Sequence, residues 1–115
     1  MINSFIDGYE KAVSYFGYWP SFHDDIIDKL EITSNEIAFY ISIQSFPDRI
    51  SSYSKIKLVF SDVKKFNLEG ELYGCLSIIL DIEFQINDNI IETQISSSLG
   101  ARGTIYSNRV QIELE

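Results

Sequence analysis

The chain has 115 residues, enough for one domain with a modest core, and we expect a single domain over residues 1–115. Nine basic against seventeen acidic residues give a net charge of −8, which disfavours direct binding of nucleic acid or of an anionic membrane surface. Apolar residues make up 45% of the chain, which is typical of a folded protein and excludes a disordered composition.

Cysteine usage and the N-terminal segment bear on the cellular compartment. Cys75 is the only cysteine and cannot form an internal disulfide, as expected in a reducing compartment. The first residues, MINSFIDGYEK, lack the basic and apolar regions of a signal peptide. No apolar run approaches the roughly 18 residues that a membrane span needs. We therefore expect a cytoplasmic protein with no membrane partner.

The first predicted element is a helix over Asn3–Phe16. Ser4 and Asp7 form a capping pair, and Gly17 stands where a helix commonly ends. Pro20 then prevents simple continuation of the helix. An apolar stripe recurs at helical spacing and consists of Phe5, Ile6, Tyr9, Val13 and Phe16.

After this helix the apolar period changes to two, which predicts strands. The expected strands are Ile26–Ile32, Glu36–Gln44, Lys55–Phe60, Ile78–Ile86, Ile90–Ser96 and a last strand with Val110, Ile112 and Leu114. The side chains expected to point inward from the first four strands are Ile26, Leu30 and Ile32; Ile37, Phe39, Ile41 and Ile43; Ile56, Leu58 and Phe60; and Ile78, Leu80, Ile82, Phe84 and Ile86.

Short polar turns at 33–35 and 87–89 can join only antiparallel neighbours, and a glycine turn at 100–103 precedes a last strand pair. We predict an α+β fold, a mostly meandering antiparallel sheet of about six strands with the N-terminal helix packed on its apolar face. A helix of about 14 residues is roughly 21 Å long and cannot cover six strands. Either the sheet curls around its core, or the segment 61–73 forms a second lid.

The stretch GYWPSFHDD, residues 17–25, holds the only tryptophan and the only histidine of the chain. A structural corner between helix and sheet is the favoured interpretation, in which aromatic side chains fill the junction and polar ones bond to nearby backbone. The residues assigned to this corner are Trp19, Pro20, Ser21, Phe22, His23 and Asp24. Direct contact with a partner is compatible with this role, because a rigid corner can display an aromatic side chain.

Enzyme chemistry is limited by the single histidine and the single cysteine. Zinc normally takes three or four His or Cys ligands, and neighbouring Asp24 and Asp25 would point to opposite faces of a strand. Cys75 lies among apolar residues, which favours an inert thiol. The sequence has no GxSxG turn and no phosphate-binding glycine loop before a helix. We expect no metal, no cofactor and no catalysis. The alternative is a small hydrolase or ligand-binding domain that uses His23 and Asp24.

Between Lys65 and Arg102 the chain carries acidic residues and no basic one. Asp81 and Glu83 share the polar face of one strand, and Glu92 lies on the next. Carboxylates that meet on paired strands destabilise a fold slightly, so this surface serves either solubility or contact with a basic protein. The candidate partner-binding residues are Asp81, Glu83 and Glu92, with Tyr40 and Tyr73 as possible aromatic anchors.

At WPSFHD, Trp19 to Asp24, followed by the strand DKLEI, the sequence resembles the immunity protein 50 family of bacterial polymorphic toxin systems. KIKLVFSDVKKFNLEG and LGARGTIYSNRVQIELE resemble later blocks of that family, so the resemblance covers most of the chain. The chain departs from the family pattern at Asp25 and Ile26, and no family role is carried over to them. The resemblance implies a small cytoplasmic protein that binds and neutralises a cognate toxin, without catalysis or cofactor.

The acidic balance favours a basic toxin domain, for example a nuclease, as that partner, because such a domain must itself attract phosphate. The sequence is compatible with a monomer or a homodimer. A homo-oligomeric structural domain, whose uncovered sheet face pairs with itself, is a further alternative.

Overall fold

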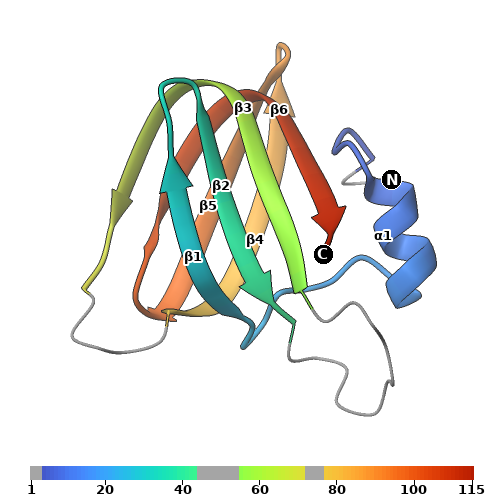
Figure 1. The fold of residues 1–115 in the computed structure, drawn as a ribbon. Helices are drawn as coiled ribbons and strands as arrows, with labels where there is room; N and C mark the ends of the chain where they lie inside the picture. The colour runs from blue at the N-terminus through green and yellow to red at the C-terminus, as the bar shows by residue number, and fades with distance from the viewer. Residues whose placement is uncertain (1–3, 44–54, 72–76) are drawn as a thin grey trace.

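The computed structural model describes residues 4–43, 55–71 and 77–115. Over these residues the chain forms one short helix and six strands (Figure 1). Their bounds are α1 (Tyr9–Phe16), β1 (Ile26–Ile32), β2 (Glu36–Ser42), β3 (Lys55–Glu69), β4 (Ser77–Asn87), β5 (Ile90–Leu99) and β6 (Arg102–Leu114). All strand pairs are antiparallel, and the order β1-β2-β3-β6-β5-β4 closes into a barrel through a short β1–β4 pairing.

The predicted antiparallel sheet with one helix is therefore confirmed, and the sheet covers its own core by curling. The segment expected as a second lid instead continues β3 as far as Glu69, and the end of that segment lies outside the described residues. The meander is interrupted, because two meanders, β1-β2-β3 and β4-β5-β6, join through β3–β6 and β1–β4. The expected last strand pair is one long strand, β6.

Alternation predicts the inner face of β2 and of the first half of β3 correctly. Every expected inward side chain of these two strands is buried, from Ile37 to Ile43 and from Ile56 to Phe60. The register sets Phe39 opposite Leu58, and Phe39 packs edge-on against Phe60 at 5.7 Å. Burial of each such side chain contributes about 1.5–3 kcal/mol. These two strands therefore form one wall of the core.

Bulges make the prediction partly wrong for β4. The register shifts on both sides of Ile79, which is completely buried, whereas the expected inward residue Leu80 is 45% exposed. Ile82 and Phe84 are inside as predicted, while Ile86 is exposed near the hairpin. Each bulge adds an unpaired residue and so reverses which neighbours face the core.

A bulge also changes which residues of β1 face the core, relative to the prediction. A register shift between Ile27 and Lys29 places Ile27 in the core, whereas Ile26, expected inside, is half-buried. Leu30 packs against the core as predicted, but Ile32 is 51% exposed. The end of β1 therefore presents an apolar side chain outside the packed interior.

The helix is shorter than predicted, because α1 begins at Tyr9. Gly8, with a left-handed φ of 88°, precedes it without a side-chain cap, so the predicted capping pair is wrong. Asp7 instead pairs with β6: its N–H donates to the Val110 carbonyl at 2.9 Å, and its carbonyl accepts from the Ile112 N–H at 2.8 Å. Gly17 ends the helix as predicted.

The helix and the segment before it cover an edge of β6. The β5–β6 pairing reaches only from Gly103 to Ser107, so among the described strands the rest of β6 pairs with β3 alone. In Figure 1 the helix lies beside this part of β6. Its buried residues, Ala12 and Phe16, belong to the core cluster of the barrel. The helix thus supplies apolar side chains where β6 and β5 diverge.

Candidate protein-binding surface at the helix–barrel corner

An aromatic cluster packs the corner between α1 and β1. Trp19 stacks on Tyr9 of the helix, with ring centroids 5.3 Å apart. Its ring also meets Phe22 and Phe84 of β4 edge-on, at 6.0 and 6.1 Å. Pro20 is buried, and Phe22 is completely buried. The aromatic residues of the WPSFHD motif therefore connect the helix to β4.

The backbone of this corner is unusual. Phe22 and Asp24 have φ values of 63° and 65°, in the left-handed region that residues with a Cβ seldom adopt. Ser21 supports the turn, because its hydroxyl accepts the N–H of His23 at 3.2 Å. The turn directs the side chains of His23 and Asp24 to the surface, where they are 62% and 72% exposed.

The corner is hydrogen-bonded to the bulged part of β4. The N–H of Asp24 donates to the Ile79 carbonyl at 2.8 Å, and the Ile79 N–H donates to the carbonyl of Asp25 at 2.9 Å. Nδ1 of His23 lies 3.0 Å from the carbonyl oxygen of Leu80. The His23 side chain bonds to backbone, although to a strand distant in sequence and not to the nearby backbone that was expected. Asp24 bonds to the same strand through its main-chain N–H, and its carboxylate faces His23.

The geometry defines the protonation of His23. A carbonyl can only accept, so Nδ1 carries a hydrogen and donates it to Leu80. Nε2 faces the carboxylate of Asp24 at 3.6 Å. The pKa of His23 is raised above its usual value, first by the hydrogen bond to Leu80 and then by the charge of Asp24, with smaller contributions from Asp25 and Asp81. Protonation at Nε2 therefore produces an ion pair with Asp24.

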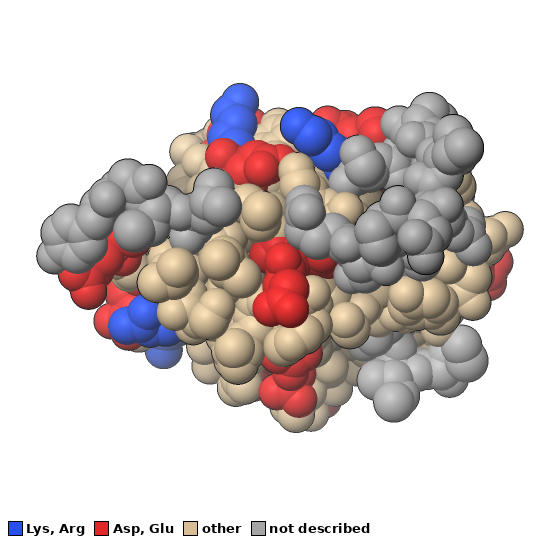
Figure 2. Space-filling view, turned by 90° about the horizontal axis from the view of Figure 1, so that it is seen from below, with Lys and Arg blue, Asp and Glu red and all other residues tan. Residues whose placement is uncertain are grey.

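Exposed apolar and acidic side chains lie together at this corner. The bulge exposes Leu80, the carboxylates of Asp24 and Asp81 both act on the neighbouring His23, and Glu83 follows on the outer face of β4. We call Asp24, Leu80, Asp81 and Glu83 the corner surface. Figure 2 views the end of the barrel at which Figure 1 places the start of β1. Acidic side chains form a column through the middle of this view, and basic ones lie toward its margins.

The strand register relates Glu92 to the corner surface. Glu83 lies opposite Gln94, and Glu92 lies opposite Gln85, so Glu83 and Glu92 are diagonal neighbours on β4 and β5. Gln94 donates a hydrogen bond to Glu92 at 2.9 Å. Within the described ranges, no lysine or arginine lies within ion-pair distance of Asp81, Glu83 or Glu92. Glu83 and Glu92 are therefore neighbours as predicted, and Asp81 lies two residues before Glu83 on the same strand, opposite Ser96.

The predicted aromatic anchor Tyr40 is not seen beside the acidic residues predicted to bind the partner. Tyr40 lies on β2, which neighbours neither β4 nor β5. Lys29 and Lys57 lie 5.1 and 5.3 Å from its ring centre, and its hydroxyl donates to Glu31 at 2.7 Å. Tyr40 is therefore not part of the corner surface, and its side chain contacts lysine and glutamate residues of β1 and β3. Tyr73 and Cys75 lie outside the described residues.

The arrangement around His23 also bears on the hydrolase alternative. One ring nitrogen donates to a backbone carbonyl and the other faces Asp24, whereas a catalytic histidine uses one nitrogen for the carboxylate and the other for the reacting group. No group of three or more histidine, cysteine, aspartate or glutamate residues among the described positions could hold a metal ion.

Comparison with known proteins adds no identification. No protein-family model matches the chain, and no curated protein shows significant similarity to it. Within the described part of the chain, no helix has the length and apolar character needed to cross a membrane.

Sequence analysis missed Leu80 and the contact between the corner and β4. A signal was present, because Ile78, Ile79 and Leu80 are three consecutive apolar residues in a strand that otherwise alternates. Such a run indicates either a strand buried on both faces or a bulge. Leu80 is exposed only if a bulge is present, and the bulge is seen only in the strand register of the structure.

Proposed function

We propose that this chain is an immunity protein that binds and neutralises a cognate bacterial toxin domain, without catalysis. The proposal rests first on the WPSFHD motif and its resemblance to the immunity protein 50 family. The observation that carries it further is the corner surface, where the residues of this motif hold the exposed Leu80 beside Asp81 and Glu83, two carboxylates without a lysine or arginine partner among the described residues.

This composition suits a protein interface better than a purely solvated surface. Protein interfaces commonly combine a central apolar side chain, which contributes most of the affinity, with a surrounding polar ring. Leu80 is the apolar centre, and Asp24, Asp81 and Glu83 form part of the ring. Hydrogen bonds to the corner fix the backbone beside Leu80, so little conformational entropy is lost when a partner binds.

The charge of the surface indicates the class of toxin. An acidic surface accelerates association with a basic protein and disfavours acidic partners. A toxin domain that acts on nucleic acid must attract phosphate and is commonly basic. We therefore infer a basic toxin domain, such as a nuclease, as the partner.

The test uses the C-terminal domain of a toxin encoded beside this chain. Its binding to the purified protein is measured by calorimetry and stopped-flow fluorescence, and protection is measured as survival of cells that express the toxin domain. Leu80→Ser is expected to weaken binding about 30-fold, in the range of an interface hot spot. The matched control is Ile86→Ser, because Ile86 is exposed to the same extent at the far end of β4.

Charge reversal tests the acidic ring. Asp81→Lys with Glu83→Lys is expected to slow association at least tenfold at low salt, whereas Glu10→Lys on the helix changes it little. Tight binding that is insensitive to all of these variants, or a complex with an acidic toxin that ignores ionic strength, would contradict the proposal. Turnover of a substrate that is lost in a folded His23→Ala variant would favour the hydrolase alternative.

A further inference from the structure

Two strand edges lie unpaired on opposite sides of a groove in the barrel wall. β1 pairs with β4 only through Ile26 and Ile27, so its remaining outer edge has no partner among the described strands. The β2–β3 pairing ends at Ser61, and Val63 donates one further hydrogen bond to the Asn35 carbonyl at 3.3 Å. From Lys64 to Glu69 this edge of β3 has no partner among the described strands. Leu30 and Ile32 of β1 and Phe66 and Leu68 of β3 line the same hollow, which places these edges across from one another.

The backbone of β1 is oriented to bind another strand. The Thr33 N–H donates to the Glu36 carbonyl at 2.9 Å, which makes this pair a hydrogen-bonded pair of the β1–β2 hairpin. In an antiparallel ladder such pairs alternate with pairs whose N–H and C=O groups point away. Ile32 and Leu30 therefore direct their N–H and C=O groups into the groove. An exposed edge of this kind is a template for strand addition.

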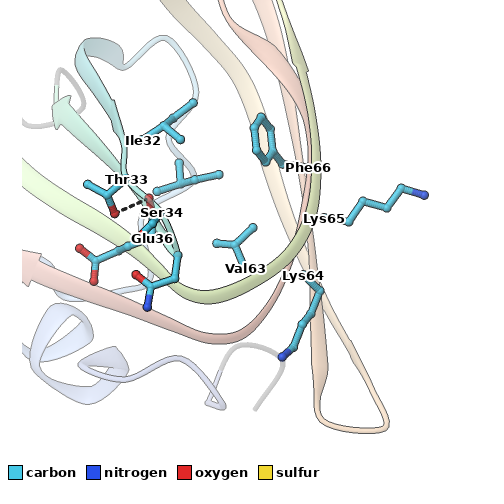
Figure 3. A pocket seen from close by; sticks show the side chains of 10 residues that line it. Ile32, Thr33, Ser34, Glu36, Val63, Lys64, Lys65 and Phe66 are labelled. Carbon is cyan, nitrogen blue, oxygen red and sulfur yellow. Dashed lines mark hydrogen bonds between the residues drawn. The ribbon is translucent and has the colours of Figure 1, made fainter.

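The lining of the groove is apolar toward Leu30 and Leu68 and mixed toward the hairpin turn at 33–35. Two adjoining hollows of about 280 and 320 Å³ share Ile32 and Phe66, which are 51% and 46% exposed. In Figure 3, Ile32 on one wall and Val63 and Phe66 on the other point into the groove. Leu30 and Leu68 continue this lining and pack against the core. A strand placed here would bury apolar side chains on its inner face.

Two lysines border the groove, although the whole protein is acidic. Lys64 and Lys65 border it on β3, and Figure 3 shows Lys65 pointing to the outer side. Among the described residues no carboxylate lies within ion-pair distance of either lysine, although Lys65 lies over the Tyr106 ring at 5.7 Å. The lining also contains two carboxylates: Glu69, which pairs with Arg102 at 3.5 Å, and Glu36 at the hairpin turn.

We propose that this groove binds an extended segment of a partner protein, in which apolar residues alternate with acidic ones. The segment adds as a strand to the edge of β1, its apolar side chains enter between Ile32 and Phe66, and its acidic side chains meet Lys64 and Lys65. This site is separate from the corner surface and does not rest on the proposed toxin contact, so Leu80→Ser is expected to leave it unchanged.

The test uses two blocked pentapeptides, one alternating valine with glutamate and the other alternating valine with lysine. Binding to the full chain is followed by NMR, with amide hydrogen exchange as a second readout. The glutamate peptide is expected to bind at least tenfold more tightly and to slow exchange at the amides of Leu30 and Ile32 at least fivefold. Lys64→Glu with Lys65→Glu is expected to reverse the preference, whereas Lys11→Glu on the helix preserves it.

A proline variant distinguishes strand addition from a nonspecific apolar contact. Ile32→Pro removes an N–H that points into the groove and no β1–β2 hydrogen bond, so the fold is retained and peptide binding is lost. Phe66→Ser gives the same loss through the opposite wall. Equal binding of both peptides, unprotected Leu30 and Ile32 amides, or shifts confined to the corner surface would overturn the proposal. Sedimentation that reveals a dimer dissociated by Ile32→Pro would instead assign the groove to a second copy of the chain.

Discussion

Phe22 and Asp24 both adopt left-handed backbone conformations at positions where most chains would place glycine or asparagine. For residues with a Cβ this conformation costs about 1–2 kcal/mol each. Complete burial of Phe22 and the hydrogen bond from Asp24 to Ile79 offset that cost. Strained residues gather at functional sites when their surroundings hold them in place. The strain therefore lies in the turn that supports the corner surface.

His23 makes the stability of this corner depend on pH. The folded-state pKa of His23 is raised, chiefly by its hydrogen bond to Leu80, so the folded protein binds the proton more tightly than the unfolded chain. The resulting stabilisation is complete below the unfolded pKa of about 6.5 and is lost as pH rises through the folded pKa. We predict that His23→Gln costs more stability at pH 5.5 than at pH 8.5.

Urea unfolding of both proteins at the two pH values measures this difference. The comparison cancels the contributions of the carboxylates, which both proteins share. Because the chain has one histidine, its NMR titration is unambiguous and should give a pKa above 6.5. A midpoint at or below 6.5 would contradict the role given to Leu80 and Asp24.

Thr93 is a buried hydroxyl in an apolar site. It is completely buried, it lies opposite Phe84 and Ile105, and its Oγ1 has no hydrogen-bond partner within the described residues. A buried hydroxyl without a partner costs free energy that valine, of the same shape, would not. We predict that Thr93→Val raises the free energy of unfolding by about 1 kcal/mol. Urea titration measures it, with the more exposed Thr104→Val as control, and a loss of stability would show that the hydroxyl is bonded.

Individual elements differ in how far the sequence predicts them, and the difference follows from local regularity. β2 contains no bulge, so the residues of its inner face, Ile37, Phe39 and Ile41, follow from the pattern alone, although Ala38 between them is buried as well. β4 and the second half of β3 contain bulges, at Ile79 and near Lys64, and each bulge reverses the inward side. Because the alternation breaks at the bulge near Lys64, the sequence pattern ends β3 at Phe60. In the structure β3 continues to Glu69 and forms one wall of the groove.

The candidate surface was predictable only in part for the same reason. The proximity of Asp81, Glu83 and Glu92 follows from strand alternation and a short turn between β4 and β5. The exposure of Leu80 and the proximity of Asp24 depend on long-range hydrogen bonds between the corner and β4. Local sequence patterns contain no information about such pairings. The placement of Leu80 beside Asp24 could therefore not be predicted from the sequence.

Gly8 connects the helix to the barrel, so a substitution there tests how tightly the start of α1 packs against β6. Its φ is 88°, and a Cβ at this position would lie 2.4 Å from the carbonyl oxygen of Ile112. We predict that Gly8→Ala lowers the free energy of unfolding by about 2 kcal/mol, through left-handed strain and displacement of the segment from β6. Thermal and urea unfolding measure the loss. Ser14→Ala, on the exposed side of the helix, is the control, and equal effects of the two variants would show that the junction is not tightly packed.

Charge is distributed unevenly over the whole molecule. The chain carries a net charge of −8, yet several carboxylates outside the corner surface have basic partners. Arg109 pairs with Asp7 at 2.6 Å, Lys29 with Glu31 at 3.3 Å, and Arg102 with Glu69 at 3.5 Å. Such exposed pairs contribute little to stability, about 0–1 kcal/mol, but they neutralise the surface locally. Asp81, Glu83 and Glu92 are among the carboxylates that have no ion pair within the described residues.

Repulsion among these carboxylates should lower stability, whereas their negative charge should speed association with the proposed basic partner. We predict that Asp81→Asn with Glu83→Gln raises the free energy of unfolding by about 0.5 kcal/mol at low salt, because the substitutions remove two like charges of β4 that repel each other and Glu92 on β5. The gain should disappear in about 0.5 M salt, where the Debye length falls to roughly 4 Å. Urea unfolding at both salt concentrations measures the gain, and toxin association with the same variant should be slower. If these carboxylates serve solubility alone, neutralising them leaves association with the partner unchanged. Stabilisation together with an unchanged association rate would therefore show that Asp81 and Glu83 play no part in binding.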